Sequence, residues 1–280
     1  MRELHRDQIM DTVRKLCVEA NVHLPCDLRS AIETAAQTEE SPVGRQILAD
    51  IIANYNLAEE KGLPICQDTG MAVVFADLGQ EVHVVGGSLE EAVNEGVARG
   101  YIEGALRCSV VEDPLRRANT NDNTPAILHL RLVPGDKLEL TVAPKGFGSE
   151  NKTVVGILSP SATRADVVNF VTAAVEKAGS DPCPPVVVGV GLGGTVEKAA
   201  ELAKRALLLP VDTPNPDPFY AGIEEELLEK INALGIGPQG LGGSTTALGV
   251  HILPHATHIA GLPCAVSIGC HATRHAGAVL

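Results

Sequence analysis

The sequence predicts a mixed α/β (α+β) fold, in which an N-terminal helical segment packs on a larger mixed-sheet portion. Residues 5–60 carry apolar residues at the three- and four-residue spacing of amphipathic helices. From residue 62 onward, strand-like runs alternate with helical patterns, which is typical of sheets covered by helices. We find no internal repeat, so we expect one domain over 1–280, with a helical subdomain at 1–61 and an α/β subdomain at 62–280.

The expected elements follow from periodicity and from turn residues. Within the N-terminal segment, Pro42 directly after Ser41 marks the start of a helix. Runs rich in Val, Ile and Leu predict strands at 71–75, 83–85, 126–132, 138–142 and 185–188. Helical spacing predicts helices at 88–99, 163–178, 195–208 and 218–234. Because Pro134-Gly135-Asp136 is a turn sequence, residues 128–142 are expected to form a β-hairpin.

Composition excludes several classes of protein. The chain has 22 Lys and Arg against 35 Asp and Glu, a net charge of −13, which argues against a nucleic-acid or anionic-membrane surface. There is no run of about 18 apolar residues, so no transmembrane helix is expected. The charged N-terminus lacks the apolar segment of a secretory signal. Seven cysteines, an odd number, favour reduced thiols or metal ligands over disulfides, and we expect a cytoplasmic protein.

A glycine-rich stretch, Gly189–Gly194, matches the spacing of a dinucleotide-binding loop between an apolar run and a helix. Pro210 precedes the acidic candidate Asp212 by two residues, inside what would have to be a buried strand. Close packing between a strand and a helix, or the binding of another anion, is therefore preferred to dinucleotide binding. A dinucleotide-binding oxidoreductase that uses Gly189–Gly194 is the remote alternative.

Three cysteines occupy polar or glycine- and proline-rich turns: Cys66, Cys183 and Cys270. Their wide separation excludes a local zinc knuckle or ferredoxin motif, but distant thiolates can still converge on one metal site. Four others are expected to be structural: Cys17, Cys26, Cys108 and Cys264. A cluster of histidines near the C-terminus leaves a zinc site open as an alternative: His251, His255, His258, His271 and His275.

Five motifs occur here in the same order as in class I, iron–sulfur-dependent fumarate hydratases and tartrate dehydratases. They are Cys66-Gln-Asp-Thr-Gly70, Lys145-Gly-Phe-Gly-Ser-Glu-Asn-Lys152, Cys183-Pro-Pro185, Gly189–Gly194 and Cys270-His-Ala-Thr-Arg274. The chain resembles the α subunit of the two-subunit enzymes, which is equivalent to the N-terminal half of the single-chain forms. The resemblance implies a hydro-lyase that is active only with a β subunit, in an α2β2 assembly.

The resemblance also implies a cofactor and site residues. Cys66, Cys183 and Cys270 match the ligands of a [4Fe–4S] cluster with one open iron, and Cys264 is the substitute if Cys270 is not a ligand. Asp68 is the best acid/base candidate that this chain offers. The positions that match substrate contacts are Gln67, Asp68, Arg107, Gly148 and His258.

The expected reaction is the reversible hydration of fumarate to (S)-malate, because Lys145–Lys152 resembles the fumarase form of this segment. The alternative is the α subunit of an L(+)-tartrate dehydratase, which performs the same chemistry on a dihydroxy acid. A non-catalytic scaffold for a partner subunit is a third hypothesis.

Overall fold

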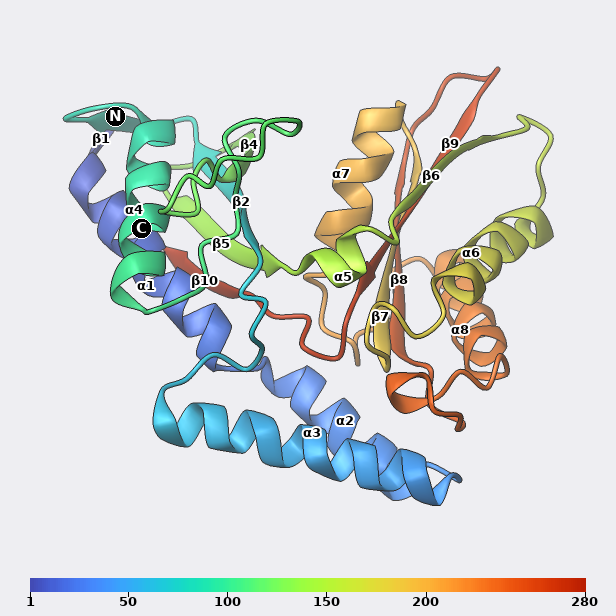
Figure 1. Cartoon of the computed structure of the whole chain (residues 1–280). Coiled ribbons are helices and arrows are strands. Elements are labelled where there is room, and N and C mark those ends of the chain that lie inside the picture. Colours follow the sequence, from blue (N-terminus) through green and yellow to red (C-terminus); the bar gives the residue numbers. More distant parts are fainter. The chain divides into compact units, whose positions relative to one another are not determined.

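The computed structural model describes residues 1–280 and confirms the mixed α/β class (Figure 1). The chain divides into two compact units. Unit 1 comprises Met1–Pro25, Tyr55–Phe147 and Arg274–Leu280, and unit 2 comprises Cys26–Asn54 and Gly148–Thr273. The helix α3 (Pro42–Lys61) has its first part in unit 2 and the remainder in unit 1. The division expected between residues 61 and 62 stays a prediction.

Unit 1 is built on a four-stranded mixed sheet with the strand order β10-β5-β2-β4. Its strands are β2 (Met71–Gly79), β4 (Ile127–Val133), β5 (Leu138–Lys145) and β10 (Ala276–Val279). Strand β2 pairs parallel with β4 and antiparallel with β5, and β10 pairs antiparallel with β5. A small parallel ladder joins β1 (Arg2–His5) to β3 (Val82–Val85).

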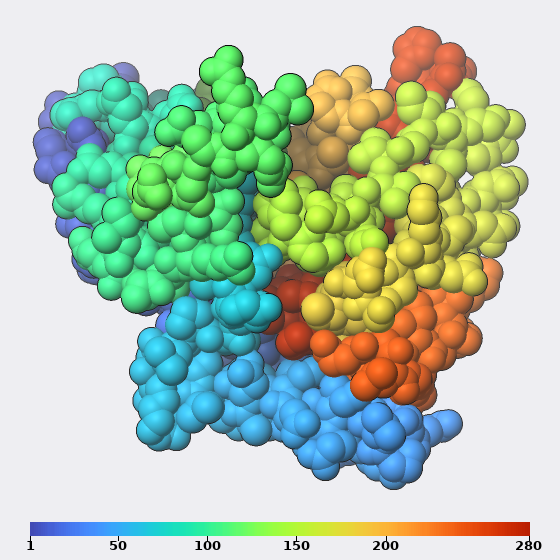
Figure 2. All heavy atoms as spheres, in the orientation of Figure 1, coloured from blue at the N-terminus to red at the C-terminus, as the bar shows by residue number.

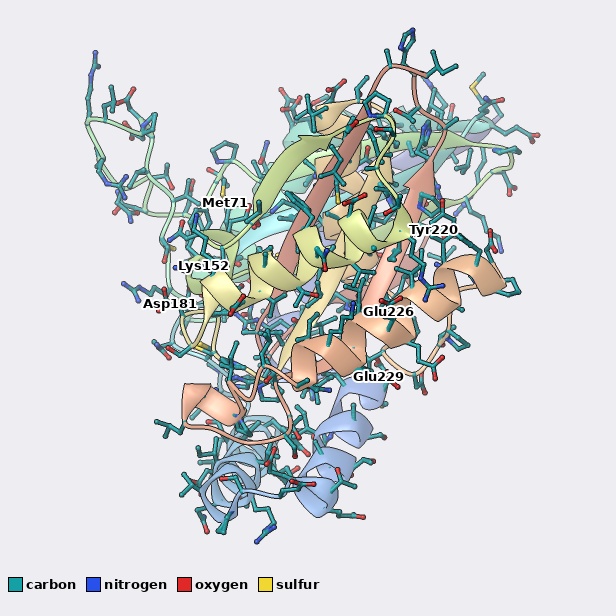
Figure 3. The ribbon with its side chains drawn as sticks, turned by 90° about the vertical axis from the view of Figure 1, so that its right-hand side faces the viewer. Met71, Lys152, Asp181, Tyr220, Glu226 and Glu229 are labelled. Carbon is teal, nitrogen blue, oxygen red and sulfur yellow. The ribbon has the colours of Figure 1, made fainter.

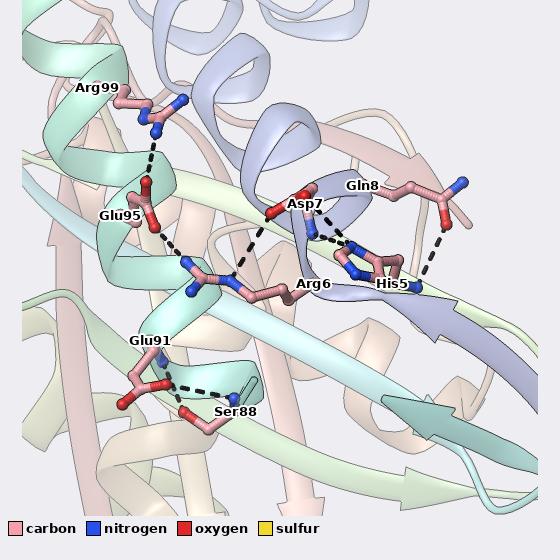
Figure 4. A network of polar contacts seen from close by, with 8 residues as sticks. All are labelled: His5, Arg6, Asp7, Gln8, Ser88, Glu91, Glu95 and Arg99. Carbon is pink, nitrogen blue, oxygen red and sulfur yellow. Dashed lines mark hydrogen bonds and ion pairs between the residues drawn. The ribbon is translucent and has the colours of Figure 1, made fainter. Parts of the chain in front are cut away.

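The core of unit 1 lies between this sheet and two helices, α1 (Arg6–Val22) and α4 (Leu89–Glu103). Alternate residues of β2, Ala72, Val74 and Ala76, are fully buried against them. The two helices are joined by an ion pair between Arg6, at the start of α1, and Glu95, in the middle of α4 (Figure 4). The amphipathic periodicity that predicted both helices is thus explained by this shared buried layer.

The predicted hairpin at 128–142 is wrong. Strands β4 and β5 do form within it, but β2 lies between them and pairs with both. The Pro134 turn therefore spans a third strand. The turn also accepts hydrogen bonds from the two residues that follow β2. Gln80 N–H donates to the Val133 carbonyl, and Glu81 N–H donates to the Gly135 carbonyl. A local turn sequence cannot reveal a strand that is inserted from earlier in the chain.

Unit 2 contains a second mixed sheet, with the strand order β6-β9-β7-β8. Its strands are β6 (Val154–Leu158), β7 (Val186–Gly193), β8 (Ala247–His255) and β9 (Leu262–Gly269). Its helices are α2 (Cys26–Thr38), the start of α3, α6 (Arg164–Ala178), α7 (Val196–Ala206) and α8 (Pro218–Asn232). The apolar sides of α6 and α8 share a buried cluster with β7, β8 and β9. The four helices expected after residue 88 and the helical N-terminal segment are confirmed.

The glycine-rich stretch is a strand and not a loop. Strand β7 runs through Gly193, and its glycines let α7 approach the sheet closely. A Cβ atom at Gly189 would overlap the carbonyl oxygen of Ala203, and one at Gly191 would overlap that of Ala199, both on α7. This confirms close strand-to-helix packing and leaves no phosphate-binding loop at 189–192. The dinucleotide alternative is therefore wrong.

None of the helices combines the length and the apolar character that crossing a bilayer requires.

Candidate functional site

In unit 1, the predicted site residues gather at one end of the β10-β5-β2-β4 sheet. Residues 66–70, here called the Asp68 loop, lead directly into β2. Met71 at the start of β2 pairs with Lys145 at the end of β5, and Arg274 lies two residues before β10. The first cysteine, the acid/base candidate and the Lys145–Phe147 segment thus share this end of the sheet.

The carboxylate of Asp68 is fixed by main-chain donors. Its Oδ1 accepts a hydrogen bond from Gly70 N–H at 3.0 Å, and its Oδ2 accepts one from Phe147 N–H at 2.9 Å. Asp68 remains partly exposed, whereas the neighbouring Thr69 is buried. An oriented, partly exposed carboxylate is suited to proton transfer with a bound substrate. Next to it, the Cys66 Sγ lies 3.4 Å from Oε1 of the exposed Gln67.

Arg107 lies on a separate loop that is bound to the Asp68 loop. The Thr69 hydroxyl accepts a hydrogen bond from Arg107 N–H at 2.9 Å and donates one to the Arg107 carbonyl at 3.1 Å. The Arg107 side chain is exposed, so its guanidinium can bind a carboxylate. The structure thus places Arg107 beside the Asp68 loop, as a shared role in substrate binding would require.

Two further polar groups brace the same loop from within unit 1. Asn123 is fully buried, donates to the Gly70 carbonyl at 3.0 Å, and accepts from Ser109 N–H at 2.7 Å. The Tyr101 hydroxyl lies 2.8 Å from the Thr69 carbonyl and 3.1 Å from that of Gly70. Burial raises the pKa of Tyr101, so its hydroxyl stays protonated and can donate. These contacts join the loops at 66–70 and 107–110.

Arg274 is a buried cation at this end of the sheet. Only 4% of the residue is exposed, and its guanidinium donates a hydrogen bond to the Asp68 carbonyl. Its Nε has no hydrogen-bond partner in the protein. Arg274 therefore adds positive charge and a direct restraint to the backbone of the acid/base candidate.

In unit 2, Cys183 and Cys270 lie at the same end of the β6-β9-β7-β8 sheet. Strands β7 and β9 are antiparallel, with Val187 opposite Gly269. The start of β7, preceded by Cys183, therefore adjoins the end of β9, followed by Cys270. The two turns are joined directly, because His271 N–H donates to the Cys183 carbonyl at 3.2 Å. We call this end of the sheet the Cys183 end.

Gly148 also belongs to the Cys183 end. It lies in α5 (Phe147–Glu150), just before β6, and a Cβ atom added to it would lie 3.5 Å from the Asp181 carbonyl oxygen. Lys152 and Asp181 form an ion pair at the same place and lie side by side (Figure 3). Gly148 itself is exposed, so its backbone is accessible to a ligand.

His258 lies at the opposite end of this sheet. It sits in the turn between β8 and β9, whose tip stands out from the surface of unit 2 in red (Figure 2), and the adjacent Ile259 is 92% exposed. The eight residues of β9 separate this turn from Cys270. At the rise of a β-strand, that is about 26 Å. His258 and the same chain's Cys270 thus cannot contact one small substrate.

The cysteines expected to be structural differ in environment, since Cys17 and Cys264 are buried, Cys108 is partly buried and Cys26 is exposed. Burial raises the pKa of Cys17 and of Cys264 to about 12, and raises that of Cys108 above its ordinary value. Cys264, the substitute ligand, is fully buried inside β9 and is poorly suited to form a thiolate. In contrast, the residues Cys66, Cys183 and Cys270 are in loops and partly or fully exposed, and no disulfide is present. Their chemistry fits iron–sulfur ligation.

The histidine-based zinc alternative has no support. No group of three or more His, Cys, Asp or Glu side chains is arranged around a common metal position. His251 is buried in β8, where burial lowers its pKa, while His255 at the end of β8 and His258 in the following turn are exposed. Cys66 belongs to unit 1, and Cys183 and Cys270 belong to unit 2. Convergence of the three thiols stays a prediction.

Sequence reasoning missed the residues that hold these loops in place. They are Thr69, Tyr101, Asn123 and Arg274. Thr69 and Arg274 lie inside the motifs at 66–70 and 270–274, and their position there was a usable signal. Tyr101 and Asn123 lie far from the motifs in the chain, and only the fold brings them to Gly70.

Comparisons with known proteins show the family to which the chain belongs. A family model described as "Fumerase: Fumarate hydratase (Fumerase)" matches residues 10–279. The "Putative L(+)-tartrate dehydratase subunit alpha" of Methanocaldococcus jannaschii is 40% identical over 279 residues, which cover 96% of this chain and 96% of that protein.

Two bacterial relatives are similar over almost the same length. The L(+)-tartrate dehydratase subunits alpha of Escherichia coli O157:H7 and of strain K12 are 32% and 31% identical over 271 residues. Each alignment covers 96% of this chain and 89% of the relative. Since the family model spans nearly the whole chain and the relatives do so as well, the chain belongs to the fumarate hydratase (Fumerase) family of hydro-lyases.

Proposed function

We propose that this chain is the α subunit of an L(+)-tartrate dehydratase. The observation that carries the proposal is the full-length match to relatives named as tartrate dehydratase α subunits, at up to 40% identity. In this reaction a hydroxyl leaves one carbon of tartrate and a proton leaves the other. The product is an enol, which tautomerises to the 2-oxo dicarboxylate. The names of the relatives thus favour the alternative substrate over the fumarate expected from the sequence.

Fumarate hydration is the second candidate. The description of the matching family model and the fumarase-like segment Lys145–Lys152 support it. Both reactions place a carboxylate beside the carbon that gains or loses a proton. The same site chemistry therefore serves both candidates, and only turnover distinguishes them.

We propose that Cys66, Cys183 and Cys270 hold a [4Fe–4S] cluster and leave one iron without a protein ligand. The chemistry of the donor set supports this, because these cysteines lie in loops while the alternative thiol Cys264 is buried with its pKa raised to about 12. When bound, such a cluster supplies a Lewis acid that polarises a substrate hydroxyl and carboxylate.

The chain's own residues then have distinct tasks. Asp68 exchanges the proton, with its carboxylate oriented by the N–H groups of Gly70 and Phe147. Arg107 binds a substrate carboxylate through its exposed guanidinium. Gln67 and the Gly148 backbone contribute further polar contacts. His258 can contact a substrate at the Cys183 end only from a second copy of the chain.

A partner is part of the proposal. The relatives' names contain "subunit alpha", and we infer that a β subunit completes the substrate pocket, in an α2β2 assembly. The isolated chain is then expected to be inactive.

The test compares two substrates under identical conditions. The chain is co-expressed with its β subunit, purified without oxygen, and assayed with L(+)-tartrate and with fumarate. The proposal expects a larger kcat/KM for L(+)-tartrate, and a larger value for fumarate would reverse the choice of substrate. An Asp68→Asn complex with normal iron content serves as the control for non-enzymatic turnover. No turnover of either substrate by an iron-loaded complex would contradict both candidates.

A further inference from the structure

Two residues of unit 2 other than glycine hold a left-handed backbone conformation: Cys183, with φ of 56°, and Gln239, with φ of 52°. Side chains that carry a Cβ atom adopt this region rarely, and such strain concentrates at functional positions. The two residues are 56 positions apart in the sequence, yet they are in neighbouring loops at the Cys183 end. Their coincidence there indicates one shared local arrangement.

Gln239 contacts both cysteine-bearing turns. Its backbone N–H donates to the Pro184 carbonyl at 2.8 Å, and its side-chain Nε2 donates to the same oxygen at 2.9 Å. The same Nε2 lies 3.2 Å from Nδ1 of His271. Pro184 directly follows Cys183, and His271 directly follows Cys270. One amide group thus touches the immediate neighbours of both cysteines.

The left-handed conformation of Gln239 is what directs its backbone N–H and its side chain to one carbonyl. The loop that carries it is itself firmly anchored. Glu39, 1% exposed, accepts hydrogen bonds from the N–H groups of Ser244 and Thr245, at 2.8 Å each. Asn232 Oδ1 accepts from Thr246 N–H at 2.8 Å. The loop that carries Gln239 is therefore fixed by contacts that do not involve the two cysteine turns.

We propose that Gln239 is a positioning residue that sets the spacing between Cys183 and Cys270. It touches neither thiol and acts through Pro184 and His271. The inference rests on the proposed function only in that it takes these two cysteines as cluster ligands. Without the Gln239 amide, the Cys183 and Cys270 turns lose this shared side-chain contact and retain those of His271 with the Cys183 carbonyl, at 3.2 Å from its N–H and 3.1 Å from its Nδ1. The paired geometry that a cubane requires is then no longer enforced.

The test uses two substitutions and a matched control. Gln239→Ala removes the amide and keeps the backbone strain, whereas Gln239→Gly removes the amide and relieves the strain. Gln46→Ala removes a glutamine of the same unit whose Nε2 bonds Asp50 at the surface of α3. Hydrogen exchange of the metal-free full chain is measured by mass spectrometry on peptides covering 180–186 and 268–275. Iron loss to a chelator is measured on the complex with its partner subunit.

Both Gln239 variants should exchange faster in the two peptides and lose iron about tenfold faster than wild type, the effect of losing roughly 1.4 kcal/mol of hydrogen bonding. Gln46→Ala should match wild type, and a peptide within β2 should exchange equally in every variant. Unchanged exchange in Gln239→Gly would overturn the inference, as would faster exchange with a wild-type rate of iron loss. If wild type and Cys183→Ser both lack iron, the proposed ligand set has failed, and the exchange result alone decides whether Gln239 positions the two turns.

Discussion

The hydroxyl of Thr69 exchanges two hydrogen bonds with the main chain of Arg107, accepting from its N–H at 2.9 Å and donating to its carbonyl at 3.1 Å. A single buried side chain thus fixes the backbone of the carboxylate-binding candidate relative to the acid/base candidate Asp68. The two residues are 38 positions apart in the sequence, and only the fold of unit 1 joins them.

Replacing Thr69 by Val should weaken substrate binding more than turnover. Valine keeps the shape of the side chain but removes both hydrogen bonds. The main chain of Arg107 is then no longer fixed relative to the Asp68 loop. We expect KM to rise about tenfold, corresponding to the loss of one or two net hydrogen bonds, with unchanged iron content. Steady-state kinetics on the reconstituted complex measure this. Thr69→Ser should restore the wild-type KM, and Thr38→Val, at the end of α2, should leave it unaltered. A wild-type KM in Thr69→Val would contradict the role of this contact.

Asp68→Asn should abolish most of the turnover. The amide is nearly the same size as the carboxylate but cannot exchange the proton, so kcat should fall about 10²- to 10⁴-fold. Iron and sulfide analysis must show that the variant still holds its cluster. Asp136→Asn, in the exposed turn between β4 and β5, is the matched control of equal charge change. Turnover within a few fold of wild type would assign the proton transfer to another group.

The sequence was sufficient for elements whose pattern is local. The helices were found because their apolar faces repeat over at least three turns, as in α1 and α6. Strands β8 and β9 were missed because glycine, histidine and proline interrupt their apolar runs, although most of their residues are buried. Pairing was not predictable either, since the hairpin at 128–142 failed through the insertion of β2 between β4 and β5.

The candidate site was predictable where chemistry lies in compact motifs. The resemblance placed Cys66 and Asp68 in one loop, and Cys183 and Cys270 in turns that the structure joins. It could not supply the bracing groups Asn123 and Gln239, because an isolated amide carries no signal in the sequence until the fold gives it partners. His258 was predicted from its match to a family position. That match could not reveal that an eight-residue strand, β9, separates His258 from Cys270.

Two glycine substitutions test whether the glycines of β7 are needed for close packing against α7. Gly191→Ala should destabilise the fold by about 3 kcal/mol or more, because the new methyl group overlaps the Ala199 carbonyl on α7. Gly148→Ala should cost little stability, because the added atom lies at an ordinary 3.5 Å from the Asp181 carbonyl. Urea unfolding measures both. If the midpoint of urea unfolding of Gly191→Ala equals that of wild type, the packing explanation of this glycine-rich strand is wrong.

Glu39 should make unit 2 sensitive to acid. Burial alone would raise its pKa, but hydrogen bonds from Ser41, Ser244 and Thr245 outweigh this and lower the pKa from 4.5 to about 2. Because the folded pKa is the lower one, the stabilisation is complete above about pH 4.5 and is lost as the pH falls towards 2.

The free energy of unfolding of Glu39→Gln should therefore be lower than that of wild type at pH 7, and the gap should narrow progressively below pH 4.5. Urea titrations at several pH values provide the measurement. Glu33→Gln, at an exposed position of α2, should show no such gap. A gap that stays constant down to pH 3 would show that the hydrogen bonds to Glu39 do not depend on its charge.

The ligand assignment is tested most directly by iron and sulfide analysis of variants in which one cysteine at a time is replaced by serine. Each variant is purified without oxygen together with the β subunit. Cys66→Ser, Cys183→Ser and Cys270→Ser should each lose the cluster. Cys17→Ser and Cys264→Ser, at buried thiols with pKa values near 12, should keep about four irons per chain. Equal iron content in all five variants, or loss of iron in Cys264→Ser but not in Cys270→Ser, would contradict the account.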